Sequence, residues 1–81
     1  MIPERLRYAR KLRGYTQERL GINAGIEEST ATSRISQYES GTHSPEFKLV
    51  QNMAKVLRVP TCYFYCDDEE LAEYLLYYYH R

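Results

Sequence analysis

The sequence has no apolar run long enough to cross a membrane, and its N-terminus lacks the apolar core of a secretory signal. We therefore expect a cytoplasmic protein with no membrane partner. Cysteine is also scarce, with Cys62 and Cys66 as the only two in 81 residues. Two thiols in such a chain are usually reduced core residues, so we interpret this pair as core rather than as a metal or redox site.

The residue spacings that catalysis and metal binding need are missing as well. His43 and His80 lie on opposite sides of the cysteine pair and have no spacing typical of zinc ligands. No nucleophile, base and orienting group come together, and there is no glycine-rich phosphate loop. We therefore expect no metal, no cofactor, no small-molecule ligand and no enzymatic activity.

Net charge is zero, because eleven basic residues balance eleven acidic ones, but the charges are unevenly distributed. Basic residues outnumber acidic ones up to Tyr65, whereas from Cys66 onward five acids face only Arg81. The basic residues near the N-terminus are Arg5, Arg7, Arg10, Lys11 and Arg13. A basic N-terminal part and an acidic C-terminal part are typical of a protein that binds a polyanion.

No segment alternates between apolar and polar residues over the length of a strand, so we predict an all-α fold. A first helix begins at Pro3 and ends at Gly14. Its inward face is predicted to be Ile2, Leu6, Ala9 and Leu12. Thr16 is the predicted N-cap of a second helix, and this helix is predicted to end at Gly25.

The third predicted helix takes Ser29 or Thr30 as its cap, and the fourth has Ser44 as cap and Pro45 at its first position. The fourth helix runs to about residue 57. Its predicted core residues are Phe47, Val50, Met53, Ala54 and Leu57. A short fifth helix follows Val59-Pro60. Its predicted core residues are Phe64 with Cys62 or Tyr63.

Two faces of the third predicted helix differ sharply. Ala31, Ile35 and Tyr38 share one face at about 100° per residue, opposite a face of short polar side chains. That polar face comprises Ser33, Ser36, Gln37 and Ser40. It has no acids and no bulky apolar groups, which suits hydrogen bonding to base edges in the major groove. The alternative is a plain solvated face.

The last predicted helix, capped by Asp67 or Asp68, is apolar over a wider arc than one packing partner needs. The stripe comprises Leu71, Tyr74, Leu75 and Tyr78, extended by Ala72, Leu76 and Tyr79. Either a second chain covers part of it or the tyrosines are half-exposed. Because aromatic clusters are enriched at interfaces, we predict a homodimer. The predicted dimerisation residues are Tyr74, Leu75, Tyr78 and Tyr79.

Several segments, taken in order, resemble the helix-turn-helix regulators of the phage repressor and Cro type, also called the xenobiotic-response-element family. They are Leu6…Arg10, residues 14–20 (GYTQERL), residues 35–41 (ISQYESG), Ser44-Pro45, and residues 53–57 (MAKVL) with Val59-Pro60. The resemblance implies a lambda-repressor-like bundle of about five helices over residues 1–65, with a C-terminal helix over residues 66–81. It also implies a third helix in the major groove and a dimer on two half-sites about one helical turn apart.

The same resemblance implies roles for individual residues. The family's base-contacting positions match Thr32, Ser33, Ser36 and Gln37. Its contacts to the DNA backbone match Gln17, Ser40, Thr42 and His43, and we add Arg34, which could reach a phosphate or brace Glu39. Arg10 and Glu39 match a partly buried salt bridge between the first and third helices of the family.

One departure from the family pattern stands out, because about four extra residues lie between Ile26 and Ile35. Either the turn or the start of the third helix must therefore be longer. The resulting prediction is a sequence-specific regulator that binds double-stranded DNA, a small repressor of prophage or mobile-element type. The alternative is an antitoxin-like interaction module whose C-terminal helix binds a partner protein.

Overall fold

The computed structural model describes residues 1–80, and these contain five α-helices, two 3-10 helices and no strand. The α-helices are α1 (Pro3–Leu12), α2 (Gln17–Asn23), α3 (Glu28–Ser40), α4 (Phe47–Leu57) and α5 (Glu69–Leu76). The 3-10 helices are η1 (Thr61–Tyr65) and η2 (Tyr78–His80). The all-α prediction is confirmed. Arg81, the last residue of the predicted C-terminal segment, lies outside the described residues.

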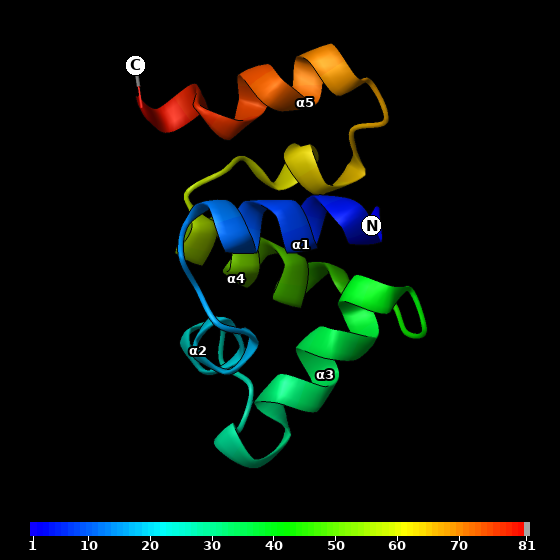
Figure 1. The fold of residues 1–81 in the computed structure, drawn as a ribbon, viewed down its shortest axis with the longest axis vertical. Coiled ribbons are helices and arrows are strands. Elements are labelled where there is room, and N and C mark those ends of the chain that lie inside the picture. Colours follow the sequence, from blue (N-terminus) through cyan, green and yellow to red (C-terminus); the bar gives the residue numbers. More distant parts are fainter. Residues whose placement is uncertain (81) are drawn as a thin grey trace.

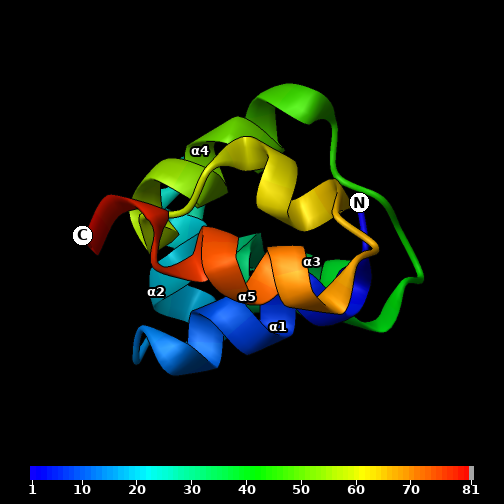
Figure 2. The same cartoon turned by 90° about the horizontal axis from the view of Figure 1, so that it is seen from above.

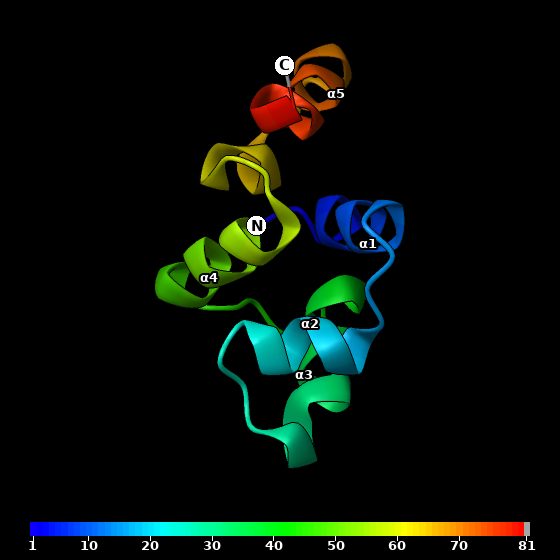
Figure 3. The ribbon, with the colours of Figure 1, turned by 90° about the vertical axis from the view of Figure 1, so that its left-hand side faces the viewer.

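The helices are stacked along one long axis. α5 lies at one end, α2 and α3 lie at the other, and α1, α4 and η1 lie between them (Figure 1). A view turned by 90° shows the same order (Figure 3). The molecule measures 35 × 24 × 20 Å, and α5 and the N-terminal end of α3 lie at the two ends of its long axis (Figure 1). None of the helices in residues 1–80 has the length and apolar character needed to cross a membrane.

The core is formed where α1 to α4 and η1 meet. Its largest fully buried side chains are Leu6, Leu20, Ile35, Val50, Met53, Leu57, Tyr63 and Phe64, with Leu76 from α5. The predicted inward face of the third helix is confirmed, because Ala31, Ile35 and Tyr38 are all buried.

Three side chains predicted to be core, those of Leu12, Phe47 and Cys62, are instead exposed. Leu12 is 42 % exposed and Phe47 is 58 % exposed. Each lies roughly a quarter turn away from the centre of the buried face of its helix. Phe47 packs instead against Tyr65, with ring centroids 6.2 Å apart. Cys62 is also exposed, so Tyr63 rather than Cys62 completes the core beside Phe64.

Helix boundaries agree with the predicted caps at two places and differ at two. The Thr16 side chain accepts a hydrogen bond from the Arg19 backbone N–H at 3.0 Å, and the Asp68 side chain accepts one from Leu71 at 2.9 Å. Both caps are confirmed. The N-cap of α3 is Glu27, so Ser29 and Thr30 lie inside its first turn. The N-cap of α4 is Glu46, whose extended backbone leaves Ser44 and Pro45 outside the helix.

Because the Tyr63 phenol is buried, the stability of the folded protein should fall at alkaline pH. Burial raises the pKa of Tyr63 from 10 to about 12. The neutral phenol therefore stabilises the folded state fully below pH 10, and this contribution is lost as pH rises through 12. We expect the melting temperature of Tyr63→Phe to fall less between pH 10 and 12 than that of the wild type. Thermal unfolding measured by circular dichroism checks this, with exposed Tyr74→Phe as control. Parallel curves for Tyr63→Phe and wild type would contradict it.

Candidate nucleic-acid interface

α2 and α3 cross at very short range. Gly21 of α2 is buried, and a Cβ added there would lie 2.8 Å from the Cβ of Ala31 in α3. The absence of a side chain at Gly21 therefore allows the two helices to touch. The chain turns between them at Gly25, whose φ of +102° is one that residues with side chains rarely adopt. Ile26 then returns to the core, as predicted.

The extra residues between Ile26 and Ile35 lengthen α3 rather than the turn. α2 ends at Asn23 and α3 already begins at Glu28, so the turn has only four residues. Seven helical residues precede Ile35, and the additional turn of helix lies at the N-terminus of α3. That end of α3 is the part of the helix farthest from α5 (Figure 1).

The outward face of α3 is polar and accessible. All four residues predicted to contact bases are exposed, namely Thr32, Ser33, Ser36 and Gln37. The Ser33 hydroxyl donates to the Thr30 carbonyl at 3.2 Å. Within residues 1–80, the side chains of Ser36 and Gln37 have no hydrogen-bond partner. Their donors and acceptors are therefore available to a ligand.

The opposite side of α3 is held by a buried ion pair. Arg10 Nε donates to Glu39 Oε2 at 2.5 Å, and Arg10 Nη2 donates to Glu39 Oε1 at 3.1 Å. Gln17 Nε2 donates to the same Glu39 oxygen at 3.2 Å. The Glu39 side chain is only 5 % exposed. These contacts tie α3 to both α1 and α2, and they keep the Glu39 carboxylate away from the polar face.

The segment after α3 forms a compact turn. Gly41 ends the helix with a φ of +80°. The Ser40 hydroxyl donates to the Gln37 carbonyl at 3.1 Å and lies 2.8 Å from the Thr42 hydroxyl. The His43 backbone N–H also donates to the Gln37 carbonyl, at 3.3 Å. The Ser40 side chain is exposed on the polar face, and the side chains of Thr42 and His43 are exposed in the turn that follows it.

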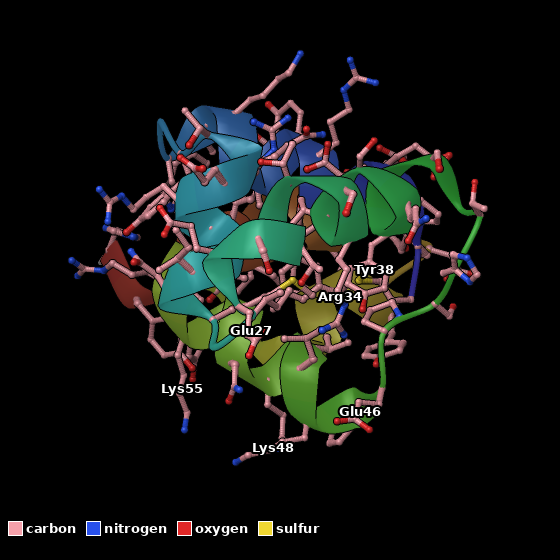
Figure 4. The ribbon with its side chains drawn as sticks, turned by 90° about the horizontal axis from the view of Figure 1, so that it is seen from below. Glu27, Arg34, Tyr38, Glu46, Lys48 and Lys55 are labelled. Atoms are coloured by element: carbon pink, nitrogen blue, oxygen red, sulfur yellow. The ribbon has the colours of Figure 1, made fainter. Side chains whose placement is uncertain are left out.

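Arg34 lies on the flank of α3 that faces α4. Its Nε and Nη2 donate to the Tyr38 hydroxyl at 3.2 and 2.7 Å, and its guanidinium carbon is 5.8 Å from the centre of the Tyr38 ring. Figure 4 shows Arg34 beside Tyr38, and Arg34 lines a hollow together with Lys48 and Asn52 of α4. The partners of Glu39 are Arg10 and Gln17, so Arg34 does not brace Glu39.

α5 has one covered side and one open side. Ala72 and Leu76 are buried, and Leu75 is half-buried. Five large side chains of α5 and the segment after it are between 37 % and 56 % exposed. They are Leu71, Tyr74, Tyr77, Tyr78 and Tyr79.

Two short helices joined by a tight turn, with the second one braced from behind and polar in front, define a helix-turn-helix protein. The helix-turn-helix family model matches residues 6–64, and the chain belongs to this family. The predicted resemblance and the predicted fold are therefore confirmed.

Comparison with known proteins gives the same class. An uncharacterized HTH-type transcriptional regulator of Sinorhizobium medicae (strain WSM419) is 33 % identical over 66 residues, which are 82 % of this chain and 45 % of that protein. A regulator of Rhizobium meliloti (strain 1021) matches with the same identity and coverage. The chain thus spans about half the length of these curated relatives. The crystal structure of transcriptional regulator BswR matches with a TM-score of 0.88 and 43 % identity, covering 94 % of this chain and 75 % of that one.

Proposed function

We propose that this protein is a sequence-specific transcriptional regulator that binds double-stranded DNA with the outward face of α3. The observation that carries the proposal is the contrast between the two sides of α3. One side is fixed by Ile35 and by the Arg10–Glu39 ion pair, while the other presents free polar groups. The regulators to which the chain is similar support the same assignment.

In this proposal α3 enters the major groove. The Gln37 amide can donate and accept together, as recognition of adenine requires, and Ser33 and Ser36 can contact either donors or acceptors. Arg34 lies at the edge of the same helix, where its charge suits a phosphate. Gln17 begins α2, and its further N–H can reach a phosphate while the first remains on Glu39. Ser40, Thr42 and His43 complete the proposed backbone contacts.

Replacing Gln37 with alanine is expected to cost about 1–3 kcal/mol of binding free energy and to relax base preference at one position. The physical reason is that Gln37 supplies base contacts rather than phosphate contacts. Competition binding to a selected site and its single-base variants measures both effects. Gln51→Ala on α4 is the control, because it removes a glutamine away from the polar face. Unchanged sequence preference in Gln37→Ala would count against α3 as the reading helix.

We further propose that the protein acts as a small repressor of prophage or mobile-element type and that it forms a homodimer through the outer face of α5. Tyr74, Tyr78 and Tyr79, beside half-buried Leu75, offer a patch of the aromatic composition typical of interfaces. Since α5 and α3 lie at opposite ends of each molecule, a dimer joined through the outer face of α5 carries its two α3 helices at its two far ends.

The antitoxin-like alternative uses the same exposed tyrosine face for a different protein. It is favoured if the protein alone sediments as a monomer at micromolar concentration. A homodimer in that measurement favours the repressor proposal, because the face is then already occupied by a second copy.

A further inference from the structure

α5 is weakly packed on the rest of the molecule. Only two of its side chains, Ala72 and Leu76, are fully buried. An open hollow of about 210 Å³ lies between α5, α1 and η1, and its lining includes Tyr8, Tyr63 and Glu73. Apolar packing alone therefore leaves the tilt of α5 poorly determined.

The first turn of α5 is instead held by Arg5 of α1. Arg5 Nε donates to the Cys66 carbonyl at 2.9 Å, and Arg5 Nη2 donates to Glu69 Oε1 at 3.1 Å. The Arg5 side chain is only 13 % exposed, and its guanidinium lies 5.9 Å from the centre of the Tyr63 ring. Burial by itself lowers the pKa of Arg5, but the hydrogen bond and charge of Glu69 raise it, so the Arg5 guanidinium stays charged.

The last turn of α5 is held by Arg13, the residue that ends α1. Arg13 Nε donates to the Leu57 carbonyl at 2.8 Å, and Arg13 Nη2 donates to the Leu76 carbonyl. These carbonyls belong to the last turns of α4 and α5, where the helix dipole is negative and a cation is favoured. One guanidinium thus connects the ends of three helices.

The two arginines match the length of α5. They are eight residues apart, about 12 Å along a helix, and the residues they hold, Glu69 and Leu76, are about 10 Å apart. α5 consequently runs beside α1 in the same direction, as seen from the front and from above (Figures 1 and 2). Both ends of α5 are therefore held by arginines of α1, Arg5 at the first turn and Arg13 at the last.

We propose that Arg5 and Arg13 are positioning residues that set which spacing of two DNA half-sites the dimer accepts. The inference rests on the proposed function, in which α5 joins the two copies and α3 reads each half-site. Each copy is 35 Å long, so a small rotation about α5 at one end produces a larger displacement at the other end, where α3 lies. A change of about 10° in the tilt of α5 moves the far end of each copy by up to about 6 Å, so the separation of the two α3 helices changes by up to about 12 Å, or roughly three base pairs.

The test uses the full chain and duplexes with two copies of its selected half-site, separated by a variable number of base pairs. Binding is measured by fluorescence anisotropy, and the dimer is verified by sedimentation equilibrium. We expect the wild type to prefer one spacing by about ten-fold over spacings two base pairs away. In Arg5→Ala/Arg13→Ala this ratio should fall to about two-fold, while binding at the poorer spacings is retained. Arg7→Ala, an exposed arginine on the same helix, should keep the wild-type ratio.

A merely structural role for the arginines would weaken binding equally at every spacing. That result, or an unchanged ratio, overturns the inference. If the double variant does not fold or dimerise, Arg13→Lys decides, because lysine keeps the charge but cannot donate in the fixed fork of a guanidinium. Arg13→Lys should broaden the spacing preference, and a wild-type ratio in that variant overturns the inference. Failure of the wild type to bind duplex DNA or to dimerise refutes the proposed function itself.

Discussion

Replacing Arg10 with alanine is expected to lower the free energy of unfolding by about 3–5 kcal/mol. The substitution leaves the Glu39 carboxylate buried, with Gln17 as its only remaining partner among the described side chains. It also removes the hydrogen bond that Arg10 Nη1 donates to the Tyr15 carbonyl at 2.9 Å. Small domains are stable by only about 5–15 kcal/mol, so the loss is a large share of the total. Urea unfolding followed by circular dichroism measures it.

Two further variants show whether the loss of stability comes from an unpaired buried charge or from the removal of any arginine from α1. Arg10→Met combined with Glu39→Leu should recover most of the stability, because no unpaired charge then remains buried. Arg7→Ala removes an exposed arginine from the same helix and should change stability by less than about 0.5 kcal/mol. If Arg10→Ala costs under about 1 kcal/mol, the pair behaves like a surface ion pair and does not anchor α3.

Deleting residues 67–81 is expected to give a monomer whose affinity for a two-half-site operator is lower by about a hundred-fold. The reason is that two linked recognition helices bind with a high effective concentration, whereas a monomer binds each half-site independently. Sedimentation equilibrium gives the oligomeric state, and fluorescence anisotropy on one-half-site and two-half-site duplexes gives the affinities. Affinity for a single half-site should change little.

A less drastic variant keeps α5 in place and alters only its outer face. Leu71 and Tyr74 are 49 % and 56 % exposed, so Leu71→Ser/Tyr74→Ser leaves the buried contacts of Ala72 and Leu76 intact. It should weaken dimerisation without unfolding the helix. A truncated protein that still sediments as a dimer would show that α5 is not the interface.

Local signals in the sequence were sufficient for most of the helices. The apolar spacing of Ala31, Ile35 and Tyr38 predicts the buried face of α3. Thr16 is predicted as the cap of α2 and either Asp67 or Asp68 as the cap of α5, and the structure has Thr16 and Asp68. The resemblance points to the Arg10–Glu39 pair, which the structure contains. These features depend on neighbours within one helix or on a pattern shared with a family.

Features that depend on distant neighbours could not be predicted in the same way. Phe47 has the spacing of a core residue, but it lies at the edge of the buried face and packs on Tyr65. The importance of Gly21 follows only once Ala31 is known to touch it. Arg5 and Arg13 donate to backbone carbonyls more than forty residues away. Every residue has a backbone carbonyl, so the residue types do not indicate which one accepts such a hydrogen bond.

The most direct test of the central claim, that the outward face of α3 reads duplex DNA, is selection of bound sites from random double-stranded DNA by the full chain and by Gln37→Ala. We predict that the wild type enriches two copies of one short half-site related by two-fold symmetry. The Gln37→Ala protein should enrich the same motif with one position of each half-site degenerate. No enriched motif for the wild type, or an identical motif for the variant, would contradict the account.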